Sequence, residues 1–231
     1  AGLPAVPRRR ATEPWTSVEA AYDRISENFA ENRRFLWPFV LEWLGAGSGS
    51  ERLLVAGCGD GRNVAAALES GRFAEVLGVD ISGGMLEAAR RRLGAEAAEA
   101  VSLVRGDVCR LPLEDASCDA VLSCAVLHHL PGGRSRTALV ELARVLAPGG
   151  RLIASCWDPR ARAVAKRGRP AAGERYAHWV AWRCADGRDV DRWYHLPPFA
   201  ERHRLWSRLP DLEIVKAELV GDNQVFEWRR L

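Results

Sequence analysis

The sequence lacks several features that would place it in a membrane or in a disulfide-bonded secreted class. No apolar run approaches the roughly 20 residues that a membrane-spanning helix needs, and no signal-peptide core opens the chain. The six cysteines are scattered without a CxxC pair, and most stand in apolar, strand-like runs, where a free thiol behaves as a small hydrophobic group. We therefore predict an intracellular protein of the cytoplasm, with the nucleus as a second location, that has reduced core cysteines, no membrane association and no metal site.

Methionine is nearly absent as well, because Met85 is the only one in a chain that begins at Ala1. We therefore expect a processed product or a fragment. The 231 residues, of which 48% are hydrophobic and 27% charged, suffice for one domain with a buried core and argue against a wholly disordered chain. Residues 1–14 carry prolines and arginines but few apolar side chains, which predicts a flexible tail.

The hydrophobic pattern changes its period after residue 50. Between residues 18 and 43 apolar side chains recur at helical spacing, which predicts two amphipathic helices broken around residues 33–38, and a Gly/Ser linker follows. Beyond it, short apolar runs alternate with helical segments, a pattern typical of a parallel sheet covered by helices on both faces. We expect strands at 53–56, 76–79, 101–104, 120–123 and 152–156, helices at 64–68, 85–93 and 135–146, and a late hairpin of strands 212–220 and 225–228.

A glycine-rich turn, Gly57-Cys58-Gly59-Asp60-Gly61, lies between the first of these strands and the helix after it. Without side chains the backbone can approach a ligand closely, and the helix start offers N–H groups without partners. Asp80 ends the next predicted strand, where a carboxylate can accept both hydroxyls of a ribose. The alternative is that Asp80 only marks the N-terminus of the following helix.

Two further elements separate the cofactor classes that share such a turn. Gly106-Asp107-Val108 follows the third predicted strand and resembles the acid-plus-apolar pair that holds adenine in class I S-adenosylmethionine-dependent methyltransferases. The segment 146–152, with an Ala-Pro-Gly-Gly turn before the fifth strand, is similar to another signature of that superfamily, and a dehydrogenase needs neither. The resemblance covers residues 52–157. It implies a Rossmann-like α/β fold with a mostly parallel seven-stranded sheet and S-adenosylmethionine as the cofactor.

The resemblance also implies which residues contact the cofactor: Gly57, Cys58, Gly59, Asp60, Gly61, Asp80, Ile81, Asp107, Val108 and Cys124. One position departs from the superfamily pattern. Many members place an acid two residues before the first glycine, where it can meet the ammonium group of the cofactor, and here that residue is Val55. Either Asp60 or a group elsewhere takes this role, or the affinity for the cofactor is reduced.

The flanking segments resemble a narrower family, the eukaryotic wobble-uridine tRNA carboxymethyl methyltransferases. The stretch 22–38 has a Tyr-Asp-x-Ile start, a phenylalanine, then Arg33 and a Trp-Pro pair at matching spacing. The segments 125–130, with two adjacent histidines, and 192–196, which reads Arg-Trp-Tyr-His-Leu, also look like motifs of that family. Late in the chain Gly221-Asp222-Asn223 is similar to a third, although Gln224 stands where the family has a tryptophan. The resemblance spans residues 22–228.

This family transfers a methyl group to the carboxylate of 5-carboxymethyluridine in the tRNA anticodon stem-loop. A carboxylate is ionised at neutral pH, so the enzyme has mainly to position and desolvate it. The resemblance implies that a cation or hydrogen-bond donors orient this group, and the candidates are Arg33, His128, Tyr194, His195 and Asn223. It also implies tRNA as a partner, together with a small zinc-binding activator subunit that pairs with an exposed sheet edge.

Each candidate has a plainer interpretation. Arg33 could be a surface charge at a helix break, and Tyr194 and His195 could pack the base of the last hairpin. On a strand His128 and His129 could not both point into one pocket, so one of them would be structural. Two tryptophans of the matching motifs, at 37 and 193, could be core or lid residues rather than platforms for a base.

Residues 158–208 are basic and rich in tryptophan, with twelve lysines and arginines against six acidic residues. This segment is either a solvated, partly disordered insert or a surface for phosphates and bases. We expect it to interrupt a methyltransferase domain over 15–231, made of an N-terminal helical segment (15–50), a cofactor-binding core (51–157) and final strands (209–231). Two other functions stay open, namely a methyltransferase for a small acceptor such as a quinone precursor, and an inactive scaffold, which Val55 favours.

Overall fold

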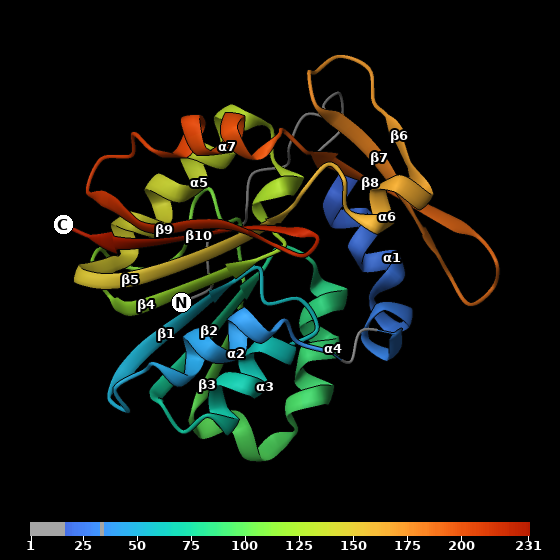
Figure 1. The fold of residues 1–231 in the computed structure, drawn as a ribbon. Coiled ribbons are helices and arrows are strands. Elements are labelled where there is room, and N and C mark those ends of the chain that lie inside the picture. The colour runs from blue at the N-terminus through green and yellow to red at the C-terminus, as the bar shows by residue number, and fades with distance from the viewer. Residues whose placement is uncertain (1–16, 33–34) are drawn as a thin grey trace.

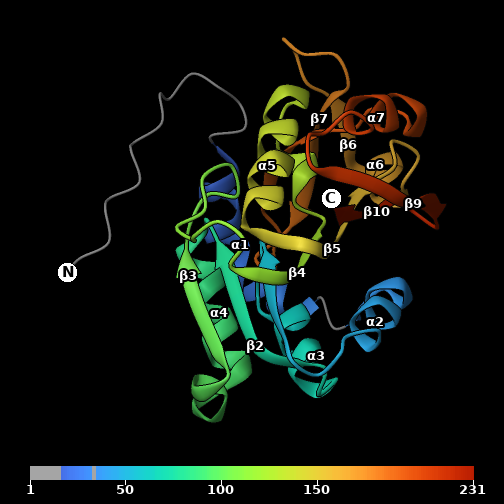
Figure 2. The same cartoon turned by 90° about the vertical axis from the view of Figure 1, so that its left-hand side faces the viewer.

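The computed structural model describes residues 17–32 and 35–231. Its main sheet consists of β1 (Glu51–Ala56), β2 (Phe73–Asp80), β3 (Val101–Arg105), β4 (Cys118–Cys124), β5 (Leu146–Trp157), β9 (Leu212–Val220) and β10 (Asn223–Arg230). The order is β3-β2-β1-β4-β5-β10-β9, with β3 and β9 at the two edges (Figure 2). Strands β1 to β5 pair in parallel, whereas β10 is antiparallel to both β5 and β9. The predicted fold class is therefore confirmed.

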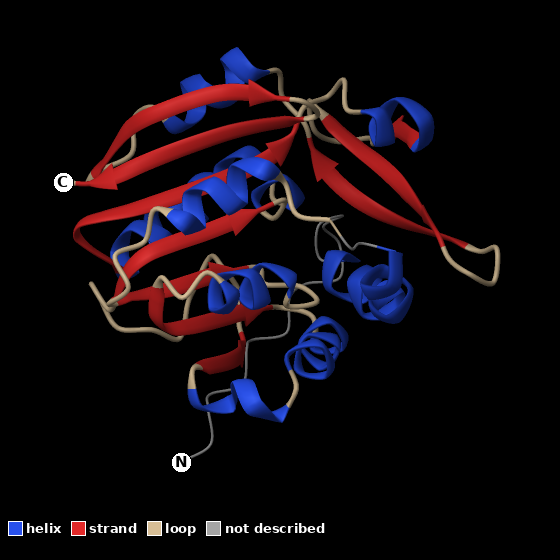
Figure 3. Cartoon of the chain, turned by 60° about the horizontal axis from the view of Figure 1, so that its bottom comes forward, coloured by secondary structure: helices blue, strands red, loops and turns tan. Residues whose placement is uncertain are grey.

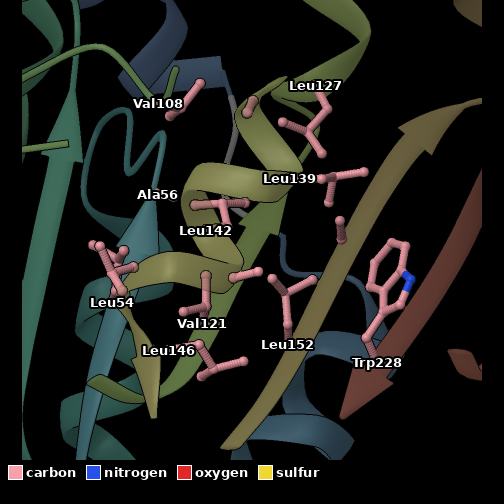
Figure 4. Packing of buried hydrophobic residues seen from close by; sticks show 14 of the residues in the cluster. Leu54, Ala56, Val108, Val121, Leu127, Leu139, Leu142, Leu146, Leu152 and Trp228 are labelled. Atoms are coloured by element: carbon pink, nitrogen blue, oxygen red, sulfur yellow. The ribbon is translucent and has the colours of Figure 1, made fainter. Parts of the chain in front are cut away.

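Helices cover both faces of this sheet (Figures 1 and 3). The helices α2 (Pro38–Gly45), α3 (Arg62–Glu69) and α4 (Gly83–Leu93) lie on one face, and α5 (Gly132–Val145) and α7 (Phe199–Trp206) lie on the other. Successive residues of a strand point to opposite faces. Leu54 and Ala56 of β1 accordingly pack with α5, as Figure 4 shows, whereas Leu53 and Val55 pack with α2 and α3. Burial on both sides explains why these strands are continuously apolar.

Helix α1 (Ser17–Asn32) lies beside α4 at the carboxyl ends of the strands rather than on a face of the sheet (Figure 1). The carboxylate of Asp23 accepts hydrogen bonds from the Ser82 hydroxyl at 2.6 Å and from the Gly84 N–H at 3.0 Å. A Cβ on Gly84 would lie only 2.9 Å from the Ser26 hydroxyl oxygen, so glycine permits this close approach. The N-terminus of α4 thus fixes α1 over the site described below.

Residues 158–208 are folded. They form α6 (Arg162–Arg167), then a small antiparallel sheet of β6 (Gly168–Pro170), β7 (Ala177–Arg183) and β8 (Asp189–His195), and then α7. Val164, Val180, Tyr194 and Leu196 make an apolar cluster there with Trp157. The interpretation as a partly disordered insert is wrong. The strands could not be recognised in the sequence because the segment is rich in charges. In the structure several of these charges are paired, with arginines of β6 and β7 bound to aspartates of β8.

The remaining elements occur where the sequence pattern predicted them, with differences at their ends. Helix α1 ends before the expected break and α2 begins at Pro38, which occupies the first helical turn. Strand β5 starts at Leu146, so the predicted Ala-Pro-Gly-Gly turn is part of the strand, with Gly149 at a φ of 76°. The tail 1–14 and Arg33 lie outside the described residues. None of the helices within 17–32 and 35–231 is long and apolar enough to cross a membrane.

Candidate active site

A cavity opens at the carboxyl ends of the parallel strands, beneath α1. Its lining includes the turns after β1 to β4, Trp157 at the end of β5, Tyr22 and Phe29 from α1, and Arg192 and Tyr194 from β8. Open α/β sheets bind ligands at this edge. Of the predicted cofactor contacts, only Gly61 does not line this cavity. The others do: Gly57, Cys58, Gly59, Asp60, Asp80, Ile81, Asp107, Val108 and Cys124.

The glycine-rich turn has the geometry that close ligand approach requires. Its three glycines all have positive φ, at 73° for Gly57, 56° for Gly59 and 78° for Gly61. A Cβ on Gly57 would lie 2.2 Å from Val126, and one on Gly61 would lie 2.9 Å from Ala89, so both positions are closed to side chains. Above Gly59 the space is open. Gly61 therefore packs the turn against α4, while Gly59 faces the space where a ligand can reach the backbone.

Asp80 sits at the end of β2, next to this turn. Its carboxylate accepts the N–H of Gly59 at 2.8 Å and that of Ser82 at 2.9 Å. Burial raises the pKa of Asp80 to about 6, although these N–H groups act in the opposite direction. The residue that caps α4 is Ser82, whose hydroxyl accepts the Met85 N–H, so Asp80 is not itself the N-cap of that helix.

The loop after β3 and the end of β4 complete this wall. The Asp107 carboxylate accepts the Cys109 N–H at 3.0 Å and lies 3.4 Å from an Arg134 nitrogen. Val108 is buried beside it. Burial raises the pKa of Cys124 to about 12, so this thiol stays protonated. An acid next to an apolar surface suits the edge and face of an adenine.

The departure at Val55 has a structural counterpart. Val55 lies on β1, is fully buried against α2 and α3, and does not line the cavity. Asp60 does line it, but its carboxylate is bound by Arg62 at 2.9 Å and by Arg92 at 2.8 Å. Open backbone at Gly59, the carboxylate of Asp80 and the Asp107–Val108 loop fit S-adenosylmethionine. That Asp60 meets the ammonium group of the cofactor stays a prediction.

The two histidines lie on the opposite wall. They belong to a short 3-10 helix, Leu127–His129, rather than to a strand, and both line the cavity. The expectation that only one could reach it was wrong because its premise, a strand, does not hold. His128 accepts the backbone N–H of Trp157 on Nδ1 at 2.9 Å, so its proton is on Nε2. Burial lowers the pKa of His128 well below its usual value and that of His129 to about 3, so both rings are neutral.

The hydrogen-bond partners of His129 determine which of its ring nitrogens carries the proton. Its Nδ1 lies 2.8 Å from the carbonyl oxygen of Trp193, which can only accept, so Nδ1 carries the proton. Its Nε2 is then an acceptor for the Tyr22 hydroxyl at 2.9 Å. The Tyr22 oxygen in turn accepts a long bond, 3.4 Å, from Arg192. Arg192 thus begins a chain of hydrogen-bond donors that runs through Tyr22 and His129 and ends on a backbone carbonyl.

Arg192 is a cavity residue that was not among the predicted site residues, although it belongs to the Arg-Trp-Tyr-His-Leu motif. It is 2% exposed, yet no carboxylate in the described part of the chain lies within salt-bridge distance of it. Its guanidinium carbon lies over aromatic rings instead, at 5.1 Å from Trp182, 5.3 Å from Tyr194 and 5.8 Å from Trp157. Its position two residues before Tyr194, on one face of a strand, was the available signal. A buried guanidinium without a counter-ion is a site for an anion.

The structure brings together only part of the predicted acceptor residues. His128 and Tyr194 line the cavity, and the Tyr194 ring stacks on Trp157 at 5.1 Å. His195 points elsewhere, 3.8 Å from Glu174, and burial lowers its pKa to about 4. Asn223 begins β10 and is buried outside the cavity lining. Of the tryptophans considered as platforms, the one at 37 lines the cavity and Trp193 does not.

Gln224, which stands at the position of the family's tryptophan, has a different task. It is fully buried and accepts from the Arg202 guanidinium at 2.6 Å. Its amide nitrogen donates to Asp158 at 2.9 Å. Arg202 also donates to the carbonyl oxygen of His195 at 3.0 Å, which joins the end of β8 to β10. This network holds the small sheet against the main one, close to the cavity.

Comparisons with known proteins agree with this geometry. The methyltransferase domain family matches residues 54–154. A protein of Encephalitozoon cuniculi named as a methyltransferase is 35% identical over 181 residues, 78% of this chain and 79% of that protein. The demethylmenaquinone methyltransferase of Clavibacter sepedonicus is 38% identical over 136 residues, 59% of this chain and 53% of the relative. The mouse tRNA (carboxymethyluridine(34)-5-O)-methyltransferase ALKBH8 is 32% identical over 141 residues, 61% of this chain but only 20% of ALKBH8.

Solved structures show the same fold. The CcbJ methyltransferase from Streptomyces caelestis superposes with a TM-score of 0.71 at 18% identity, covering 91% of this chain and 97% of that one. The complex of the Haloferax volcanii Trm112 methyltransferase activator with a methyltransferase gives 0.68 at 14% identity, covering 94% and 97%. The cavity, the glycine-rich turn and the relatives all indicate the same family. The chain belongs to the class I S-adenosylmethionine-dependent methyltransferases.

Proposed function

We propose that this methyltransferase transfers the methyl group of S-adenosylmethionine to the carboxylate of 5-carboxymethyluridine at the wobble position of tRNA. The observation that carries the proposal is the buried Arg192, a cation inside the cavity without a carboxylate partner in the described chain. A guanidinium can hold a carboxylate through two parallel hydrogen bonds. The acceptor itself then supplies the missing counter-ion.

The protonation states of the cavity point to the same class of acceptor. The bound cofactor supplies an electrophilic methyl group, and a neutral acceptor would have to lose a proton during transfer. His128 and His129, with their lowered pKa values, are poor bases, since burial disfavours a positive charge on either ring and the nearby Arg192 adds to this effect. Cys124 is held protonated by its raised pKa. An acceptor that arrives as an anion needs none of them as a base.

Two relatives with a matching name support this substrate. The mouse protein and an Arabidopsis thaliana relative, 33% identical over 141 residues, both carry the name tRNA (carboxymethyluridine(34)-5-O)-methyltransferase. This chain spans 20% and 32% of their lengths. The similarity to a demethylmenaquinone methyltransferase keeps a small acceptor as the competing function.

A small zinc-binding activator is part of the proposal. The Haloferax volcanii structure holds a methyltransferase of this fold together with its activator. Strand β3 is an edge strand, and one side of it has no strand partner among the described residues, so its backbone could pair with such a subunit. The large exposed apolar residues of the described chain lie on other elements, among them β9 and α2, so backbone pairing would contribute more than an apolar patch.

The test is an incubation with tRNA that lacks wobble methyl esters, with and without a Trm112-type activator. Labelled cofactor and nucleoside digestion should then yield the methyl ester of 5-carboxymethyluridine. Arg33→Ala should spare cofactor binding and impair this transfer. Methylation of a quinone precursor but not of tRNA would establish the competing function, and absence of cofactor binding in calorimetry would establish an inactive scaffold.

A further inference from the structure

Most exposed cations of the small-sheet region fall into two sets according to their partners, and Arg175, which lies over the Tyr176 ring, belongs to neither. Exposed arginines of β6, β7, the turn before β8 and α7 form ion pairs: Arg169 with Asp191, Arg183 with Asp189, Arg188 with Asp186 and Arg204 with Glu201. Three exposed cations of α6, here called the α6 cations, have no ion pair within the described residues. They are Arg162, Lys166 and Arg167.

The α6 cations stand on the outer side of their helix. Val164 is buried and Ala163 half-buried, so the inner side of α6 packs on the apolar cluster of the small sheet. Arg162 and Lys166 are four residues apart and share one exposed face. The Asp222 carboxylate accepts the backbone N–H of Arg162, but no carboxylate of the described chain forms an ion pair with these three side chains. This makes them different from the β7–β8 hairpin, where each acid has an arginine.

The register of the small sheet ties these cations to the cavity. Gly168, directly after Arg167, lies opposite Val180, and Val180 lies opposite Arg192. Two strand spacings separate the end of α6 from the buried cation, which is about 10 Å. The other end of α6 follows Trp157, a cavity wall, through a tight turn closed by a hydrogen bond of 2.9 Å from the Ala161 N–H to the Asp158 carbonyl. Figure 1 shows α6 beside β7 and β8 on the side of α1.

We infer that the α6 cations bind backbone phosphates of the RNA whose reactive nucleotide enters the cavity. This inference rests on the proposed function. A small acceptor that fills the cavity would not reach exposed side chains two strands away, whereas a polymer with a negative charge at every nucleotide reaches both. Unpaired cations release counter-ions when they meet phosphates without first breaking an ion pair, so they contribute more than the paired arginines beside them. The contact gives affinity rather than sequence selection.

The test compares two charge-matched variants of the full chain, with the activator subunit if the protein requires it. Lys166→Gln/Arg167→Gln removes two α6 cations. Arg72→Gln/Arg229→Gln removes two exposed cations at the opposite end of the sheet, where β2 begins and β10 ends, also without ion pairs in the described chain. The measurement is binding of fluorescent, unmodified tRNA as a function of salt, with calorimetry of the cofactor as the check on folding.

The α6 variant should bind tRNA about tenfold more weakly at low salt and lose roughly two units of the salt slope. The control variant should bind within twofold of the parent, and both should keep cofactor affinity. Equal weakening of the two variants, or no weakening in the α6 variant, would overturn the inference. Unmodified tRNA separates this from the proposed function: selective loss of binding without any carboxymethyluridine ester would support the surface and refute the acceptor.

Discussion

The two walls of the cavity are built in different ways. The cofactor wall consists of backbone turns that continue directly from β1, β2 and β3, and the carboxylate of Asp80 at the end of β2 accepts hydrogen bonds from the main-chain N–H groups of Gly59 and Ser82. The acceptor wall consists of side chains from α1, the 3-10 helix and β8, far apart in the sequence, around one buried cation, Arg192. The first wall follows from strand order, whereas the second depends on how separate elements pack.

The charges on the two walls are opposite as well. Asp80 offers acceptors for hydroxyl groups, and Arg192 offers donors for an anion. Each residue is therefore expected to serve one ligand only. Substitutions on the two walls should separate cofactor binding from acceptor binding, and the following predictions test that separation in order of decreasing effect.

The largest effect is expected for Asp80→Ala. Loss of two charge-assisted hydrogen bonds to ribose, together with loss of the carboxylate that orders Gly59 and Ser82, should weaken cofactor binding by about 1,000-fold. Calorimetry measures this directly, and methyl transfer should fall with it. The thermal midpoint serves as the folding control. Retention of cofactor affinity within tenfold would mean that ribose is held elsewhere and that the two walls do not divide as described.

A smaller but more selective effect is expected for Arg192→Met, which keeps much of the side-chain volume and removes the charge. Transfer to the acceptor should fall by about 100-fold, the size expected when one partner of a buried charge pair is lost. Cofactor affinity should stay within twofold. Removing an uncompensated buried charge should also stabilise the free protein by on the order of 1 kcal/mol. Lower activity in a more stable protein distinguishes a binding role from a structural one, and a drop in stability would contradict it.

The sequence predicted the cofactor wall better than the acceptor wall, because the two walls are built differently. The turn at residues 57–61, Asp80 and the Asp107–Val108 loop were predicted because a local motif at a strand end fixes them. Arg192 could not be placed, since its burial depends on Trp157, Trp182 and Tyr22 meeting across two sheets. His195 was expected at the site but alternates to the other face of β8. The small sheet itself was hidden by charges that turned out to be paired.

The pH dependence of cofactor binding sharpens the comparison further. Because burial raises the pKa of Asp80 to about 6, this carboxylate, which we expect to accept ribose hydroxyls, is charged above that pH and protonated below it. Cofactor affinity should be constant above pH 6 and should fall by up to about tenfold per pH unit below it. Calorimetry between pH 5 and 8 checks this, and Asp80→Asn, which cannot titrate, should give a flat profile. A slope in that variant would assign the titration to another group.

The smallest expected effect belongs to Tyr22→Phe, which removes only the hydroxyl between His129 and Arg192. The bond from Arg192 is long, so the loss is mainly that of the bond to His129, about 1 kcal/mol, and kcat/KM for the acceptor should fall by about fivefold while cofactor affinity stays unchanged. The direction of the chain explains why the loss is small: the Trp193 carbonyl still fixes the His129 ring, and the aromatic rings still surround Arg192. In the Arg192→Met background the same substitution should have almost no further effect on transfer, because Tyr22 would then have no cation to position. Full additivity of the two losses would show instead that Tyr22 contacts the acceptor itself, and the acceptor wall would extend onto α1.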